Sequence, residues 1–175
     1  NIAIGRNALN LTTTGHGNVG VGASALKANT TGIQSTAIGY ETLTANTTTG
    51  ECTAVGFRAL KDATGARNNA VGTYASSQVS SGERNESMGY AALYTATTAS
   101  YNIAIGYKCL HLLTTSSENV AIGAFAGYEM TTAAGNVAVG NYCLYDTTTG
   151  HSNTAVGGYS PTTGGSNVIA ALRMN

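Results

Sequence analysis

The sequence predicts an all-β fold, a parallel β-solenoid with one 17-residue repeat per coil and about ten coils. Near-copies of residues 102–106, Asn-Ile-Ala-Ile-Gly, recur along the whole chain, and their glycines are 17 residues apart with a single spacing of 16. These repeat glycines are Gly5, Gly22, Gly39, Gly56, Gly72, Gly89, Gly106, Gly123, Gly140 and Gly157. A short fixed period is typical of solenoids, in which each coil buries its apolar side only by stacking on its neighbours.

We number the repeat so that Asn102 occupies position 1 and Gly106 occupies position 5. Position 4 is aliphatic in all ten copies, and successive side chains of a strand point to opposite faces. We therefore expect positions 2 and 4 to face the coil interior, together with the leucine at position 9. Alanine at position 3 and glycine at position 5 would then form a nearly bare outer strip, against which another surface packs closely.

Glu86 conflicts with this assignment, because it occupies position 2 and an unpaired buried carboxylate is costly. The same coil carries Ser87 and Met88 where other copies have alanine and a branched residue. We expect residues 85–89 to form a splayed or partly solvated coil.

The rest of each repeat connects one strand to the next. Residues 90–94, which are typical of the part that follows the glycine, fit a single helical turn or a strand equally well. Thr-Thr-Gly tripeptides such as residues 30–32 then supply turn geometry. Position 1 is asparagine in most copies, and we expect these amides to form a hydrogen-bonded ladder from coil to coil.

The C-terminal end of the chain differs from the middle. Residues 1–166 form the repeat array, but its tenth copy is shortened by three residues and contains Pro161, the only proline. Residues 167–175 are expected to form a degraded terminal coil or a cap, because an open solenoid end needs altered repeats. The chain begins directly within a repeat, and we expect it to be part of a longer protein.

Composition and charge exclude several classes of protein. The chain has 175 residues, a net charge of zero and 9% charged residues, so a nucleic-acid partner is not expected. There is no run of about 18 apolar residues, so we expect no membrane insertion in this segment. Cys109 and Cys143 share position 8 but lie two coils, about 9.6 Å, apart, beyond the reach of a disulfide. With Cys52 they are expected to be free thiols.

No motif for catalysis, a cofactor or a metal is present in the sequence. The three histidines, His16, His111 and His151, occupy variable positions, and the carboxylates are scattered over the repeat without a catalytic pair. Neither a Cys-x-x-Cys nor a His-Glu-x-x-His motif occurs. We expect no enzyme activity, no cofactor and no bound metal.

Aromatic residues form the most suggestive pattern for binding. Position 10 of four successive coils carries a ring, and positions 6 and 7 nearby add others. The candidate ligand or partner surface comprises Tyr90, Tyr94, Tyr107, His111, Tyr128 and Tyr145, with Phe125, Tyr142 and Tyr159 beside them. An outward ladder of such rings could bind sugars or protein partners, while a stabilising stack or a contact between protomers is the alternative.

The repeat resembles two families of fibre proteins. Residues 153–166 match the 14-residue Ser-Val-Ala-Ile-Gly-x-x-Ala-x-Ala-x-Gly-x-x pattern of head repeats in trimeric autotransporter adhesins. Residues 36–48 follow the Asn-x-Ala-(Ile/Val)-Gly-Tyr-x-Ala-Leu-x-x-Asn-Thr-Thr-Gly array of phage-type tail-fibre and bacterial surface-fibre proteins. The resemblance implies a left-handed β-roll that assembles as a homotrimer. It also implies an extracellular structural or adhesive role on a virion fibre or bacterial cell surface, with a cell-surface glycan or receptor as a further partner.

Two other functions remain open for such a solenoid. Its threonine-rich columns suggest ice binding, although Thr13 and Thr14 are adjacent in sequence, whereas a flat ice-binding array needs threonines two residues apart. An extracellular carbohydrate-binding module is the other alternative, and it would use the aromatic ladder.

Overall fold

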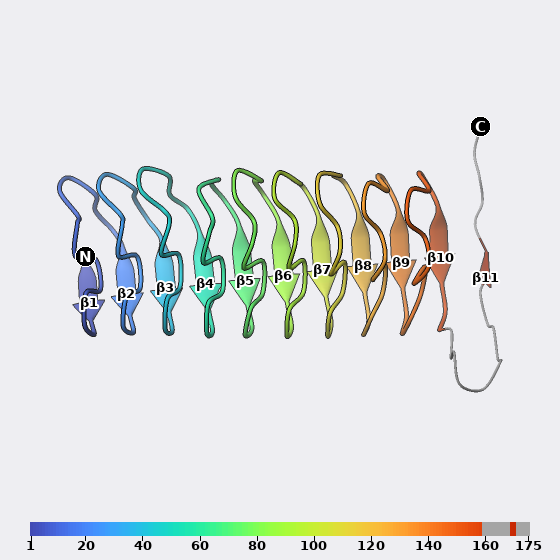
Figure 1. The fold of residues 1–175 in the computed structure, drawn as a ribbon, viewed down its shortest axis with the longest axis horizontal. Coiled ribbons are helices and arrows are strands. Elements are labelled where there is room, and N and C mark those ends of the chain that lie inside the picture. Colours follow the sequence, from blue (N-terminus) through green and yellow to red (C-terminus); the bar gives the residue numbers. More distant parts are fainter. Residues whose placement is uncertain (159–168, 171–175) are drawn as a thin grey trace.

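The chain folds as a parallel β-solenoid in a computed structural model that describes residues 1–158 and the backbone of residues 169–170 (Figure 1). The first ten strands have three residues each, and each of β1 to β9 pairs in parallel with the next, in sequence order. The strands are β1 (Ile2–Ile4), β2 (Val19–Val21), β3 (Thr36–Ile38), β4 (Thr53–Val55), β5 (Asn69–Val71), β6 (Glu86–Met88), β7 (Ile103–Ile105), β8 (Val120–Ile122), β9 (Val137–Val139) and β10 (Thr154–Val156). The predicted fold class and repeat length are therefore confirmed, with about nine turns in the described part.

The single 16-residue repeat lies between β4 and β5, where Thr53 pairs with Asn69. The Thr64 hydroxyl donates to the carbonyl of Ser80, 16 residues on, where equivalent bonds elsewhere span 17. Gly65, in contrast, keeps the ordinary place of position 15, since its missing Cβ faces the carbonyl of Gly82. The repeat has thus lost position 14, which lies outside the strands, and strand pairing is undisturbed.

The last strand differs from the others in direction. Strand β11 (Ile169–Ala170) pairs antiparallel with β10, so that Ala170 lies opposite Ala155. This pairing covers part of the outer edge of β10, which otherwise offers unpaired backbone groups. The rest of the expected terminal cap, together with Pro161 and Tyr159, lies outside the described residues.

The inner and outer sides of each strand are the reverse of our expectation. Ala37, at position 3, is 0% exposed, whereas Ile38, at position 4, is 41% exposed. The leucine at position 9 explains the reversal, because a Cβ added to Gly20 at position 3 would lie only 3.3 Å from Leu9 Cγ. Leucine already fills the space in front of the strand, so only alanine or a smaller residue fits inside, and the branched side chains point outward.

The repeat glycines lie in single file, as expected, but they serve stacking within the chain and do not form a bare outer strip. Gly39 has a φ of +134°, a conformation that L residues rarely adopt. A Cβ there would also lie 2.4 Å from the carbonyl oxygen of Gly56 in the next coil. Position 5 is glycine because the backbone turns sharply there and the neighbouring coil is in direct contact.

The segment after each glycine is neither the helical turn nor the strand that we considered. Positions 7 and 9 both have positive φ in most coils, as in Glu41 (φ 53°) and Leu43 (φ 48°). This left-handed conformation costs an L residue about 1–2 kcal/mol. It turns the chain twice in three residues, so that Leu43 is completely buried while Glu41 stays near the surface.

The asparagine ladder at position 1 is confirmed. The carbonyl oxygen of Asn102, Oδ1, accepts hydrogen bonds from the backbone N–H of Asn119 at 3.0 Å and from its Nδ2 at 3.1 Å. Asn102 Nδ2 in turn donates to Asn85 Oδ1 and to the carbonyl of Ser116, both at 3.1 Å. Asn102 is fully buried, so its side chain satisfies polar groups that water does not reach.

We predict that Asn102→Ala lowers the free energy of unfolding by about 2 kcal/mol, because it leaves buried donors without acceptors. Denaturant unfolding followed by circular dichroism measures the change. Asn10→Ala is the matched control, since Asn10 is exposed, and it should change stability by less than about 0.5 kcal/mol. Equal effects of the two substitutions would show that the ladder contributes little.

The coil around residues 85–89 is not splayed, contrary to expectation. Strand β6 pairs in parallel with both β5 and β7, and Glu86 causes no conflict because position 2 faces outward. Ser87 replaces the inward alanine, and Ser76 replaces the leucine of the preceding coil. Their hydroxyls hydrogen-bond at 2.8 Å in the interior, so the two polar substitutions compensate each other.

Candidate functional site

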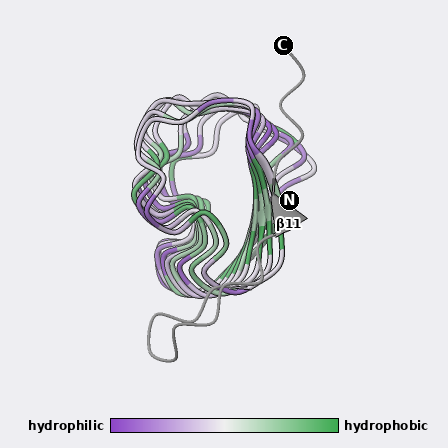
Figure 2. Ribbon diagram, turned by 90° about the vertical axis from the view of Figure 1, so that its right-hand side faces the viewer, coloured by the Kyte–Doolittle hydropathy of each residue, from purple (hydrophilic) through white to green (hydrophobic). Residues whose placement is uncertain are grey.

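The outward side of the sheet is the most prominent surface of the molecule. We call the side chains at positions 2 and 4 of β1–β10 the aliphatic face. Seen along the solenoid axis, the strands of all coils superimpose on one side of the outline, where hydrophobic residues are concentrated (Figure 2). The position-4 file is Ile4, Val21, Ile38, Val55, Val71, Met88, Ile105, Ile122, Val139 and Val156. All of these side chains are at least partly exposed.

The aliphatic face is flat, long and almost uncharged. Ten strands extend over about 43 Å and three residues over about 10 Å, at usual strand spacings. Apolar patches of several hundred Å² on a monomer commonly mark an interaction site. Glu86 is the only charged residue at positions 2 to 4 of these strands. A partner with a flat apolar surface therefore fits this face best.

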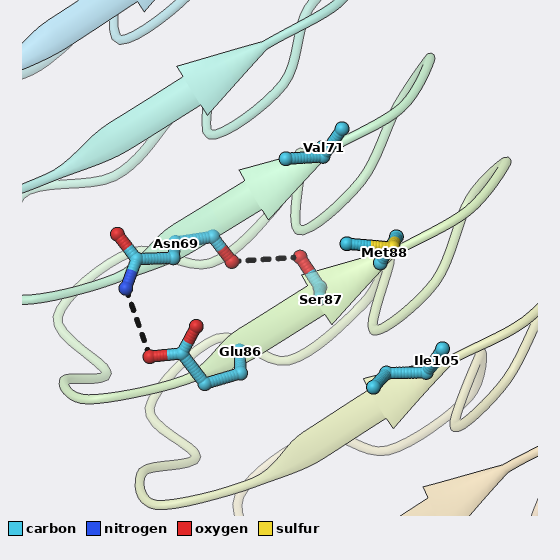
Figure 3. Close-up of a pocket in the computed structure, with 6 residues that line it drawn as sticks. All are labelled: Asn69, Val71, Glu86, Ser87, Met88 and Ile105. Carbon is cyan, nitrogen blue, oxygen red and sulfur yellow. Dashed lines mark hydrogen bonds between the residues drawn. The ribbon is translucent and has the colours of Figure 1, made fainter.

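A pocket of about 110 Å³ interrupts the aliphatic face near its middle (Figure 3). It is lined by Asn69, Val71, Glu86, Ser87, Met88 and Ile105. Asn69 Nδ2 donates a hydrogen bond of 2.8 Å to Glu86 Oε1 across neighbouring strands. Glu86 forms no ion pair with a residue of the described chain. The pocket is therefore mostly apolar, with a polar pair beside it whose carboxylate still has acceptor capacity.

The aromatic ladder predicted at position 10 is formed by stacked rings. The ring centroids of Tyr94, His111, Tyr128 and Tyr145 follow one another at 5.2, 5.3 and 5.2 Å, with interplanar angles of 14°, 4° and 7°. Tyr90 and Tyr107 stack in the same way at 5.4 Å and 13°. The faces of the rings thus cover one another. Binding of a sugar ring, in contrast, requires an aromatic face that is free. This geometry favours the stabilising stack over a sugar-binding platform.

The ladder extends further than the sequence analysis recognised. Tyr40 stacks on Phe57 at 5.5 Å, and Phe57 meets Tyr74 edge-on at 5.2 Å. The signal was present, because these residues occupy the same positions 6 and 7 as the aromatic residues that we singled out.

Burial lowers the pKa of His111, and its Nδ1 lies 3.0 Å from the carbonyl oxygen of Ala91. The stack is therefore uncharged at neutral pH.

A second ladder, of threonine and serine hydroxyls at position 13, was not expected. Thr97 Oγ1 donates to the carbonyl of Thr114 at 3.2 Å, and Thr114 Oγ1 donates to the carbonyl of Thr131 at 3.1 Å. The carbonyl of Thr114 also accepts the backbone N–H of Thr98. These hydroxyl hydrogens are therefore bound to the backbone. The exposed column at position 14, which includes Thr98 and Thr132, stays accessible to solvent.

The remaining candidate groups are the cysteines and the possible metal ligands of residues 1–158. The three cysteines are free and buried, as predicted, and Cys109 Sγ donates to the carbonyl of Ala121 at 3.1 Å. Burial raises the pKa of Cys109 to about 12, so that it is a neutral thiol at physiological pH. Within residues 1–158, no three His, Cys, Asp or Glu side chains lie close enough together to hold a metal ion.

Comparison with known protein families, curated proteins and solved structures gives no match. Among the residues that the structure describes, no helix is long and apolar enough to cross a membrane. The function must therefore be argued from the surfaces of the solenoid itself.

Proposed function

We propose that this chain is a non-enzymatic structural and adhesive segment of an extracellular fibre. The fibre would be a virus tail fibre or the head of a bacterial surface adhesin, as the sequence resemblance implies. Copies of the chain would form a homotrimer of left-handed coils through their aliphatic faces. The exposed file of branched side chains at position 4, which runs from Ile4 to Val156, is the observation that carries the proposal.

A second copy of the same chain is the partner that fits the aliphatic face best. Its side chains repeat once per coil, about every 4.8 Å, and another solenoid of the same kind presents the same repeat. The face is almost uncharged, since it carries a single carboxylate along its whole length, so a second copy brings little charge against it. Three rods with one flat apolar side each can close around a common axis and bury all three faces.

Assembly through this face would leave the other sides of each coil accessible. The aromatic ladder and the threonine corner lie outside the strands and would form the outer surface of the fibre. We place attachment to a cell-surface glycan or receptor on this outer surface, at the variable positions beside the stacked rings, because the faces of the rings are covered by one another. The stacked rings stiffen it, because each ring is held by its neighbours in adjacent coils.

Sedimentation equilibrium of the 175-residue chain tests the proposal. We expect a mass of three times the 17.6-kDa chain at micromolar concentration. A chain that remains monomeric under these conditions would contradict the assembly on which the fibre proposal rests.

Ice binding is a second candidate, favoured by a feature of the same face. Thr36 and Ile38 point outward from β3, as do Thr53 and Val55 from β4, so that threonines occur beside branched residues on a flat sheet. Such a face could order water only if no second copy covered it. A monomeric chain that depresses the freezing point by thermal hysteresis would favour this function over the fibre.

A further inference from the structure

A uniform aliphatic face gives assembled copies no axial register. The position-4 file is apolar in every coil, so a copy shifted by one coil, about 4.8 Å, meets nearly the same surface. Each shift leaves one coil uncovered at either end of the assembly. These uncovered coils would bind further copies, so that an unregistered assembly would grow instead of closing.

The pocket on β5 and β6 is the feature that makes one level of the face different from the others. The remaining residues at position 2 are isoleucine, valine or threonine, and only this level carries an amide and a carboxylate. Met88, the longest side chain of the position-4 file, stands beside them and is 52% exposed. Figure 3 shows Asn69 and Glu86 joined across the two strands, with Val71, Met88 and Ile105 in a file beside them.

We propose that Asn69 and Glu86 set the axial register of the copies that assemble through the aliphatic face. This inference rests on the proposed function, because it needs a second copy on that face. Register by a buried polar residue is the best-attested role of such groups in apolar interfaces.

We call two copies level when equivalent strands lie at the same height along the solenoid axis. Hydrogen-bond capacity explains why level copies are favoured over shifted ones. Within the described chain, Asn69 Nδ2 makes one hydrogen bond, to Glu86 Oε1, and Glu86 Oε2 makes none. When copies are level, the amide of a neighbour's Asn69 comes within one coil of this free oxygen and can donate to it. A level neighbour also brings its own Met88 to the height of the pocket.

A shifted copy instead places aliphatic side chains over at least one of the two carboxylates. Even a one-coil shift that brings Asn69 opposite Glu86 leaves the other copy's Glu86 opposite Ile103. Glu86 then loses water without gaining a donor, and burial of an unpaired charge is strongly unfavourable. Only one of the many possible axial positions therefore satisfies both the apolar file and the polar pair.

The test compares three forms of the full chain by sedimentation velocity. The wild-type chain should form one oligomeric species. Asn69→Thr with Glu86→Val gives β5 and β6 the residue types of their neighbours, and this smooth variant should form several species, including larger ones. Both substitutions are at outward positions of strands and introduce good strand formers, so the fold is retained.

The third form moves the polar pair to another level. The smooth variant with Val120→Asn and Val137→Glu carries the same pair on β8 and β9 and should again form one species. The relocated variant and untagged wild-type chains are each mixed and refolded with tagged wild-type chains. The relocated variant should co-purify with the tagged chains at least tenfold less than the untagged wild-type chains do. Its polar pair reaches the height of the wild-type pair only if the two copies are offset along the axis.

The outcomes separate this inference from the fibre proposal. A smooth variant that forms the same single species as the wild type would overturn the register role while leaving self-assembly intact. Equal co-purification of the relocated and wild-type chains would overturn it as well. A monomeric wild-type chain would contradict the proposed function and, with it, this inference.

Discussion

The double variant Ile38→Asp with Ile122→Asp is expected to be a folded monomer at concentrations where we expect the wild-type chain to form the proposed trimer. Both side chains point outward and are 41% and 38% exposed, so a single chain accepts aspartate at either position. In the assembly each aspartate would be buried without a partner, at a cost of at least about 2 kcal/mol. Two such sites per chain should weaken association about a thousand-fold, since 1.4 kcal/mol corresponds to a factor of ten.

Sedimentation equilibrium measures this dissociation, and circular dichroism verifies that the β-structure is retained. Thr48→Asp with Thr132→Asp is the matched control, because it places the same charges in the same two coils, at the exposed corner away from the strands. The control should remain trimeric. If the aspartates on the aliphatic face left the trimer intact, another surface would have to hold the copies together.

Gly106→Ala is expected to destabilise the solenoid strongly, as is the same substitution at the other repeat glycines of its interior coils. Gly106 has a φ of +140°, and a Cβ there would lie 2.4 Å from the carbonyl oxygen of Gly123. The atom in the way is backbone of the adjacent coil, so relief requires two stacked coils to move apart. We expect a loss of about 3–5 kcal/mol in the free energy of unfolding, from strain and lost stacking combined.

Gly135→Ala separates the two contributions to this loss. Gly135 also has a positive φ, +66°, but the nearest atom to an added Cβ, Ser152 Oγ, lies 3.7 Å away. Only the conformational cost of about 1–2 kcal/mol should remain. Denaturant unfolding of both variants measures the difference. Similar losses would mean that the close contact between repeat glycines is easily relieved.

Much of the fold could be predicted from the period alone. A repeat of 17 residues sets one coil per repeat, and stacking in register brings equivalent residues together, which is why the asparagine ladder at Asn102 and the ring stack at His111 were foreseen. Both depend only on the fact that residue i lies beside residue i+17. Neither depends on which way a strand faces.

Which side chains of a strand point into the coil interior could not be predicted from the period. Alternation along three residues shows that Ala37 and Ile38 lie on opposite sides, but it does not show which side is interior. The deciding residue is the leucine at position 9, whose side chain reaches the strand only because positions 7 and 9 adopt left-handed conformations. Non-glycine residues such as Glu41 and Leu43 give no sequence signal for that conformation.

The same error concealed the candidate site. The file of branched residues was evident in the sequence, but it was assigned to the core, so the aliphatic face was missed. Glu86 was the contrary sign, since a carboxylate at position 2 is costly inside and unremarkable outside. The pocket beside it depends on the hydrogen bond between Asn69 and Glu86 and on the position of the Met88 side chain, which sequence periodicity does not encode.

The lost residue between Thr64 and Gly65 shows where this molecule tolerates change in length. A deletion at that corner leaves Thr53 paired with Asn69 and the strands in step. Longer or shorter loops at the same corner could therefore diversify what the solenoid displays to its surroundings, independently of the aliphatic face. A peptide grafted between Thr64 and Gly65 would be displayed outside the strands and would leave the aliphatic face unchanged.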